Sequence, residues 1–311
     1  MRKGDSFVNL QKLLKTLCVT GLAIGILHGC NLKIVAPLSG SVVSDSGMYV
    51  CQSGETCTIN KSSGLINEVF RTVPEEGYFF QYWLNGDNHL CSDETGSCAN
   101  LVNSGIELDE SLVRELFSGQ ASFTLQPKFK LRNGFTAPIK GIRADVEVAY
   151  DTVEYPLQGS TYDEVIAQIQ SEANPLPIKP ETGKRSASEA SSDISYNFFE
   201  LIFSGDTCVL YTAELQAQYR TVLPRALSYN SMTESDKLRW DNALNTWNDR
   251  AIARHAITRQ AVSDLRSVLE DSGIIACERI RDEVESDIGA ILLQLNSDLA
   301  NFDLNASLGE I

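Results

Sequence analysis

The chain has 311 residues, of which 41 are acidic and 26 are basic, so its formal net charge is −15 at pH 7. This balance argues against a nucleic-acid-binding protein, because that affinity comes mainly from Lys and Arg contacts with phosphates. It equally disfavours binding to anionic lipid through a basic patch. A hydrophobic content of 43% is typical of a packed globular protein, and the length fits two domains of roughly 150 residues each.

The first 29 residues have the pattern of a secretory signal. Four basic residues and one acidic residue precede an apolar run at 17–27, and the small residue Gly29 follows it. The alternative is a membrane-spanning helix, but the run is shorter than the roughly twenty residues that a span needs. Removal of residues 1–29 would change the net charge from −15 to −18.

The junction Leu27-His28-Gly29-Cys30 resembles the processing site of bacterial lipoproteins. The resemblance implies that Cys30 is lipidated, becomes the mature N-terminus and anchors the protein to a membrane. Asn31 replaces the Asp that retains some lipoproteins at the inner membrane, which implies the outer membrane, on its periplasmic face or at the cell surface. A plain signal peptide with an incidental Cys30 is the alternative.

Six further cysteines follow Cys30, and an exported protein meets an oxidising compartment in which an even set indicates disulfides. The spacing favours three pairs: Cys51–Cys57, Cys91–Cys98 and Cys208–Cys277. Six cysteines allow fifteen connectivities, so other pairings stay open. Zinc binding by the first four is a further alternative, although their spacings are wider than usual for zinc.

Residues 30–134 are expected to form a small all-β module held by disulfides, because short extended runs alternate with turn sequences. The string from Val73 to Trp83, of the form VPxxGYxFxxW, resembles a small β repeat of bacterial surface proteins. We interpret Tyr78, Phe80 and Trp83 as core residues, with an exposed carbohydrate platform as the alternative. One short helix is expected near 109–117.

Residues 135–311 are expected to form an α+β domain. After a connection at 131–143, the pattern predicts a strand at 144–157, a helix at 163–172, a loop at 174–192 and strands at 194–203 and 207–223. A long helix begins after the N-cap Thr233 and ends at Gly273, and a second helix extends through Phe302. We expect the two helices to form an antiparallel hairpin against a small sheet.

The order of features in residues 144–311 resembles a bacterial family described as predicted secreted zinc-dependent proteases. The matching pieces are Tyr155-Pro156-Leu157-Gln158-Gly159-Ser160-Thr161, Cys208-Val209, Leu223-Pro224, Trp240 upstream of His255, and Cys277 at the start of the last helix. The resemblance implies a zincin-like domain, with a His-Glu-x-x-His motif on the long helix and a third His near the C-terminus.

This chain departs from the family pattern at three of its four site positions. It has His255 at the first ligand, but Ala256 replaces the catalytic Glu, Arg259 replaces the second His, and Leu308 occupies the expected third-ligand position. Catalytic zinc takes three protein ligands, and only His89 and His255 remain after processing. We therefore expect no zinc or other cofactor, and we interpret His255 as a packed side chain.

Other catalytic patterns are missing from the sequence, including a Gly-x-Ser-x-Gly elbow and a Gly-rich phosphate loop. The hypothesis is a lipid-anchored envelope protein whose inactive protease-like domain binds or scaffolds a protein or envelope partner. The alternative is an active zinc-dependent peptidase, or another hydrolase, with a rearranged site around His255.

Overall fold

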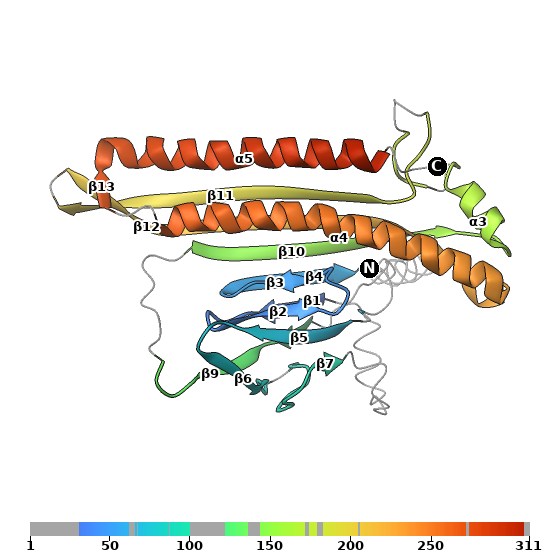
Figure 1. Cartoon of the computed structure of the whole chain (residues 1–311), viewed down its shortest axis with the longest axis horizontal. Helices are drawn as coiled ribbons and strands as arrows, with labels where there is room; N and C mark the ends of the chain where they lie inside the picture. Colours follow the sequence, from blue (N-terminus) through green and yellow to red (C-terminus); the bar gives the residue numbers. More distant parts are fainter. Residues whose placement is uncertain are drawn as a thin grey trace, which may run out of the picture.

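The computed structural model describes residues 31–61, 66, 68–86, 88–99, 122–135, 144–171, 174–178, 183–204, 206–271 and 274–307. Cys30, Leu308, the signal segment and the helix expected at 109–117 lie outside these residues. The fold class is α+β, as predicted: sheets with disulfides precede long strands and a pair of long helices (Figure 1).

The N-terminal part consists of short strands. They are β1 (Asn31–Val35), β2 (Gly40–Ser44), β3 (Val50–Cys51), β4 (Glu55–Lys61), β5 (Val69–Pro74), β6 (Tyr78–Trp83), β7 (Cys98–Ala99), β8 (Ser122–Leu125) and β9 (Pro127–Leu131). Trp83 is completely buried, and the ring of Phe80 packs edge-on against it at 5.3 Å. The aromatic side chains at these two positions therefore pack internally, as the sequence predicted.

The C-terminal part contains longer elements. They are β10 (Ala144–Leu157), α3 (Tyr162–Gln168), β11 (Glu189–Ser204), β12 (Thr207–Ala226), a 3-10 turn (Tyr229–Ser231), α4 (Glu234–Asp271), β13 (Ile274–Ala276) and α5 (Cys277–Ser307). α4 and α5 pack side by side, and α4 lies against β10, β11 and β12 (Figure 1). The expected helical hairpin on a sheet is thus present.

β11 begins earlier than the sequence predicted. We expected a loop through residue 192, but the strand starts at Glu189, because Glu189 through Ser192 pair with Val222 through Tyr219 of β12. The long partner strand supplies hydrogen bonds that local composition does not reveal. α3 also ends at Gln168, four residues before the predicted end.

One seven-stranded sheet contains strands from both parts of the chain. Its main path is β11-β12-β10-β4-β1-β8, with β13 added to β12. The junction is the parallel pairing of β4 with β10, from Val146 opposite Glu55 to Thr152 opposite Lys61. Buried apolar side chains from β1, β4, β10, β12, α4 and α5 form one continuous core across this junction.

Candidate functional site

The buried face of α4 carries the residues to which the sequence pointed. Apolar residues on this face include Ala251, Val262 and Leu265, all buried against the sheet. His255 and Arg259 are four residues apart, so they project from the same side of the helix. His255 is 1% exposed, which places its ring in the core and not at a surface.

The His255 imidazole is held by neighbours from β12. Its Nε2 lies 2.9 Å from Oγ1 of Thr221, and the ring meets that of Tyr219 edge-on at 5.1 Å. Burial, together with the positive charges of Arg259 and Arg254, lowers the pKa of His255 to about 4. The ring is therefore neutral near pH 7.

Arg259, which follows His255 by about one helical turn on this face, has a permanent positive charge. Its charge acts on the hydroxyl of Tyr150 on β10, where it opposes the burial that raises the pKa of that phenol to about 12. Its charge also opposes the burial that raises the pKa values of Tyr219 and of Glu55. At this position the family pattern expects a metal ligand, whereas this chain has the cation of Arg259 near the phenol groups of Tyr150 and Tyr219.

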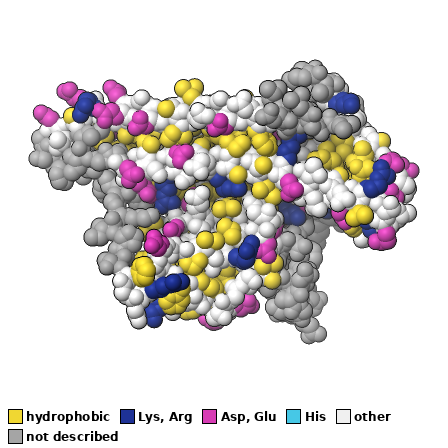
Figure 2. All heavy atoms as spheres, viewed as in Figure 1, with side chains coloured by type: hydrophobic (Ala, Val, Ile, Leu, Met, Phe, Trp, Pro, Cys, Tyr) yellow, Lys and Arg dark blue, Asp and Glu magenta, His cyan; other side chains and the backbone are white. Residues whose placement is uncertain are grey.

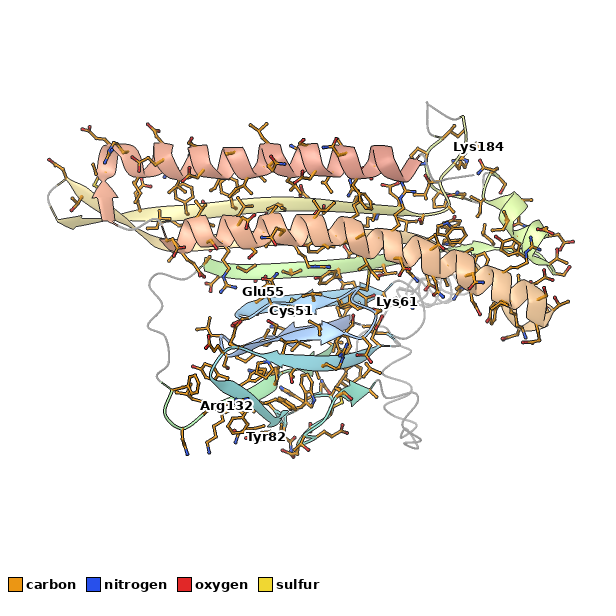
Figure 3. The ribbon with its side chains drawn as sticks, viewed as in Figure 1. Cys51, Glu55, Lys61, Tyr82, Arg132 and Lys184 are labelled. Carbon is orange, nitrogen blue, oxygen red and sulfur yellow. A yellow bond between two sulfur atoms is a disulfide. The ribbon has the colours of Figure 1, made fainter. Side chains whose placement is uncertain are left out.

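Glu55 of β4 is a buried carboxyl group that the sequence analysis did not single out. It is 3% exposed, and its Oε2 accepts a 2.7 Å hydrogen bond from the backbone N–H of Gln52. Burial raises its pKa to about 7, against the opposing effects of that hydrogen bond and of Arg266 and Arg259. Figure 3 shows Glu55 at the end of β4 that lies beneath the helices.

A sequence signal for Glu55 did exist. Alternate residues of a strand face the same side, and Glu55 is in phase with Cys57 and Ile59, both fully buried. A carboxylate in register with two core residues is a candidate for a shifted pKa. The pattern could be recognised only once the start of β4 was known.

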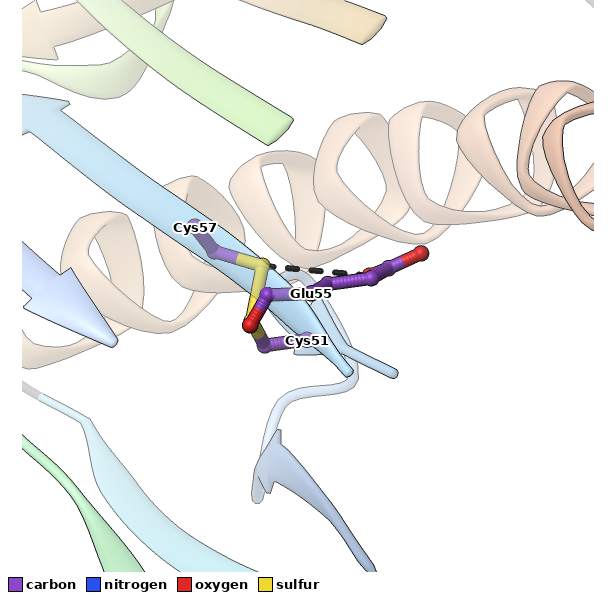
Figure 4. Close-up of side chains that lie close together, drawn as sticks. All are labelled: Cys51, Glu55 and Cys57. Atoms are coloured by element: carbon purple, nitrogen blue, oxygen red, sulfur yellow. Dashed lines mark hydrogen bonds between the residues drawn. A yellow bond between two sulfur atoms is a disulfide. The ribbon is translucent and has the colours of Figure 1, made fainter. Parts of the chain in front are cut away.

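Glu55 also belongs to a group of side chains with metal-ligand chemistry. Within the described residues, the ligand atoms of Cys51, Glu55 and Cys57 lie within 4.8 Å of one another (Figure 4). Cys57 Sγ is 3.9 Å from Glu55 Oε2, but the two sulfurs are bonded to each other as a disulfide. Metal binding by cysteine uses the free thiolate, so this pair does not offer two sulfur ligands.

The structure contains all three disulfides that the spacing favoured. Besides Cys51–Cys57, they are Cys91–Cys98 and Cys208–Cys277. The third connects β12 to the first residue of α5 across 69 positions of sequence. The first four cysteines are therefore paired with each other and do not form the four-thiolate set of the zinc alternative.

The remaining site positions do not converge on His255. Ala256 is exposed and has no carboxylate, while Leu308 lies outside the described residues. His89 lies in the segment between β6 and β7, where it forms an isolated bridge with Thr124 of β8.

A cavity of about 610 Å³ opens where the N-terminal half of α4 faces the ends of β4, β10 and β12. Asn245, Asn248 and Asp249 line it from the helix, and Tyr49, just before β3, and Thr152 of β10 line it from the opposite side. The hydroxyls of Tyr49 and Thr152 are 3.2 Å apart. A helix face bearing amides and a carboxylate opposite a sheet is suited to a polar ligand.

Charges in this cavity are mixed. Glu154 forms ion pairs with both cations of the lining, Lys61 at 3.2 Å and Arg225 at 3.8 Å. Two further carboxylates accept hydrogen bonds from hydroxyl groups: Glu68 from Ser46, and Asp241 from Tyr229. Figure 2 likewise shows acidic, basic and apolar side chains interspersed on one face of the molecule. No helix within the described ranges is both long and apolar enough to span a bilayer.

Comparison with known proteins gives one match. The model of a family described as bacterial protein of unknown function, DUF922, matches residues 152–309. That range includes part of β10, all of β11 and β12, and both α4 and α5. No curated protein and no solved structure matches the chain.

Proposed function

The chain belongs to the DUF922 family of bacterial proteins of unknown function, and from this premise we propose that it is an exported, lipid-anchored envelope protein that binds or scaffolds without cleaving peptide bonds. Its C-terminal part would be an inactive relative of the secreted zinc-dependent proteases that residues 144–311 resemble.

The observation that carries the proposal is the environment of Arg259. A catalytic zinc site needs three protein ligands and an open position. At the place where the resemblance expects the second ligand, Arg259 supplies a cation whose charge acts on the Tyr150 hydroxyl. The retained His255 turns its Nε2 to Thr221, and Ala256 has no carboxylate to activate water. This donor set does not fit a zinc ion.

The cavity beside α4 is the surface that supports a binding role. It combines apolar residues such as Met48 and Ile252 with the amides of Asn245 and Asn248 and several carboxylates. A ligand or partner segment with hydrogen-bond donors would be complementary to this lining.

The tether would act close to this cavity. Asn31, the residue after Cys30, is the first residue of β1 and pairs with Asn60 of β4. The residue after Asn60 is Lys61, which lines the cavity. Acyl chains on Cys30 would therefore orient this end of the sheet toward the membrane.

Metal content and a gain-of-ligand variant test the proposal. We expect wild-type protein, purified with zinc present, to retain no stoichiometric zinc, and the combined change Ala256→Glu, Arg259→His, Leu308→His to gain zinc affinity by restoring the missing groups. Ala253→His is the control, because it adds an imidazole at an exposed position of the same helix. Stoichiometric zinc in the wild type, or peptidase activity lost on chelation, would overturn the proposal.

The mature N-terminus is a separate test. Mass spectrometry of protein from bacterial membranes is expected to find Cys30 as the first residue with added acyl mass. Cys30→Ser is expected to shift the protein from the membrane to the soluble fraction, because several buried acyl chains supply the anchoring. An unmodified Cys30 would remove the lipid anchor from the proposal and leave the binding role in place.

One observation favours the alternative of an active hydrolase. Burial raises the pKa of the Glu55 carboxyl group to about 7. A buried carboxyl group with such a pKa is typical of a general acid or base. If Glu55 served in that role, Glu55→Gln would abolish a hydrolytic activity that the wild type displays. Hydrolysis by the wild type that survives this change would exclude Glu55 from the chemistry.

A further inference from the structure

Four buried side-chain nitrogens lack a hydrogen-bond partner within the described residues, and all four belong to α4. They are Arg254 Nη1, His255 Nδ1, Arg259 Nη1 and Arg266 Nη2. Buried polar atoms in native proteins normally have partners, so a group of unpaired nitrogens on one helix indicates an acceptor that the protein chain does not supply. This observation is independent of the proposed function.

His255 and Arg259 place two of these nitrogens within one turn of the helix. A hydroxyl can donate to an imidazole nitrogen, and when Thr221 donates to Nε2, the proton of the neutral ring is on Nδ1. His255 Nδ1 and Arg259 Nη1 then both present N–H groups. His255 itself is 1% exposed, so bulk water does not satisfy its ring.

The three arginines differ in how their charge is compensated. Arg254 is 3.3 Å from Asp303, and Arg266 is 2.9 Å from Glu270. Within the described part of the chain, Arg259 has no carboxylate at ion-pair distance; its polar neighbour is the Tyr150 hydroxyl. The Arg259 residue is half-buried, and its charge lowers the pKa of Glu55, whose carboxyl group is nevertheless ionised only in part near pH 7 because that pKa is about 7. A cation whose counter-charge is incomplete is costly to bury.

We propose that a small monovalent anion of halide size binds beside α4, held by the N–H groups of His255 Nδ1 and Arg259 Nη1. A water molecule would satisfy the two donors but would leave the charge of Arg259 balanced only in part by Glu55, which is not fully ionised near pH 7. The rings of Tyr150 and Tyr219, 2% and 1% exposed, enclose the cluster from the sheet, which favours a monatomic ion over a larger ligand.

Bromide serves as the probe, because its anomalous scattering identifies it in a crystal. Crystals of the mature chain in sodium bromide are expected to give an anomalous peak within hydrogen-bond distance of His255 Nδ1 and Arg259 Nη1. Water at that position, or bromide peaks confined to the molecular surface as adventitious ions only, would overturn the proposal.

Thermal unfolding provides the second measurement. At constant ionic strength and pH, replacing sodium isethionate with sodium bromide is expected to raise the Tm of the wild type, because an ion that binds only the folded state lowers the unfolding constant about 100-fold at 100 times its Kd. Arg259→Gln is expected to lose this shift. Arg281→Gln, which removes the same charge from a half-exposed site on α5, is expected to keep it. Equal Tm values for the wild type in both salts would contradict bromide binding.

Discussion

Glu55 lies against the Cys51–Cys57 disulfide with almost no contact with water. Burial penalises the charged form of its carboxyl group, while Gln52, Arg266 and Arg259 favour that form only in part. Arg266 of α4 also contacts the turn before β4: its Nη1 donates a 2.6 Å hydrogen bond to the carbonyl of Ser53. Because the charge of Arg266 also acts on Glu55, the ionisation of Glu55 is coupled to the contact between α4 and the turn that precedes β4.

The pH dependence of stability follows from the direction of this shift. The folded-state pKa, about 7, lies above the ordinary value of 4.5, so the contribution of Glu55 is fully present below pH 4.5 and is lost as the pH rises through 7. We expect Glu55→Gln to remove this loss and raise the free energy of unfolding at pH 8 by about 3 kcal/mol relative to the wild type.

Chemical denaturation at pH 4.5 and pH 8 measures this effect. Glu76→Gln is the matched control, because Glu76 lies in an exposed turn and the same change should leave both values nearly unaltered. A wild-type stability that does not fall between these pH values, relative to Glu55→Gln, would contradict the buried carboxyl group.

Among the elements, β12 and the two long helices depend on one another. β12 pairs with β10, β11 and β13, and α4 packs across the same sheet. α5 begins at Cys277, whose backbone N–H donates to the carbonyl of Asp206 and whose sulfur is bonded to Cys208. The start of α5 is thus fixed to β12 by a covalent bond as well as by packing.

Loss of this disulfide is expected to destabilise the protein substantially. The bridge closes a loop of 69 positions, for which the chain-entropy model gives about 4 kcal/mol. Replacing Cys208 and Cys277 together by Ser avoids a free thiol, and denaturant unfolding measures the loss. The Cys91–Cys98 pair closes only seven positions, so the corresponding double Ser variant is expected to lose less, roughly 2.5 kcal/mol. Equal losses would contradict the loop-length argument.

For the whole molecule, the seven-stranded sheet determines how the two parts of the chain cooperate. The parallel pairing of β4 with β10 covers an edge that would otherwise expose unpaired N–H and C=O groups. The shared core extends across the same junction. The boundary between two domains that we expected near residue 134 stays a prediction. The hydrogen bonds between β4 and β10 join strands from the two sides of this boundary.

We therefore expect the two parts to unfold together. In native-state hydrogen exchange, the amides of β4 and β10 should open with the same free energy, because the strands pair over Glu55–Lys61 and Val146–Thr152. A fragment of residues 135–311 should be less stable than the same region of the full chain. Separate opening free energies for β4 and β10, with an unaffected fragment, would contradict this cooperativity.

Local signals were sufficient for much of this protein. The extended pattern at 144–157 predicted β10, and the interpretation of His255 as a packed side chain is confirmed by its burial on α4. Cysteine spacing pointed to the three disulfides. These features depend on residues close together in the sequence, or on the few pairings that the spacing favoured.

Tertiary structure alone decided which groups surround Arg259 and Glu55. Tyr150, Tyr219 and Glu55 come from three strands, and they meet α4 only because β4 joins β10 in one sheet. Desolvation and the field of nearby charges act through space and not along the chain. The phase of Glu55 within β4 indicated its burial, but the charges that face Glu55 and the groups that surround Arg259 have no local signature. The sequence shows that residues 55 and 259 are a Glu and an Arg, but the pairing of strands that are distant in the sequence determines their electrostatic environment.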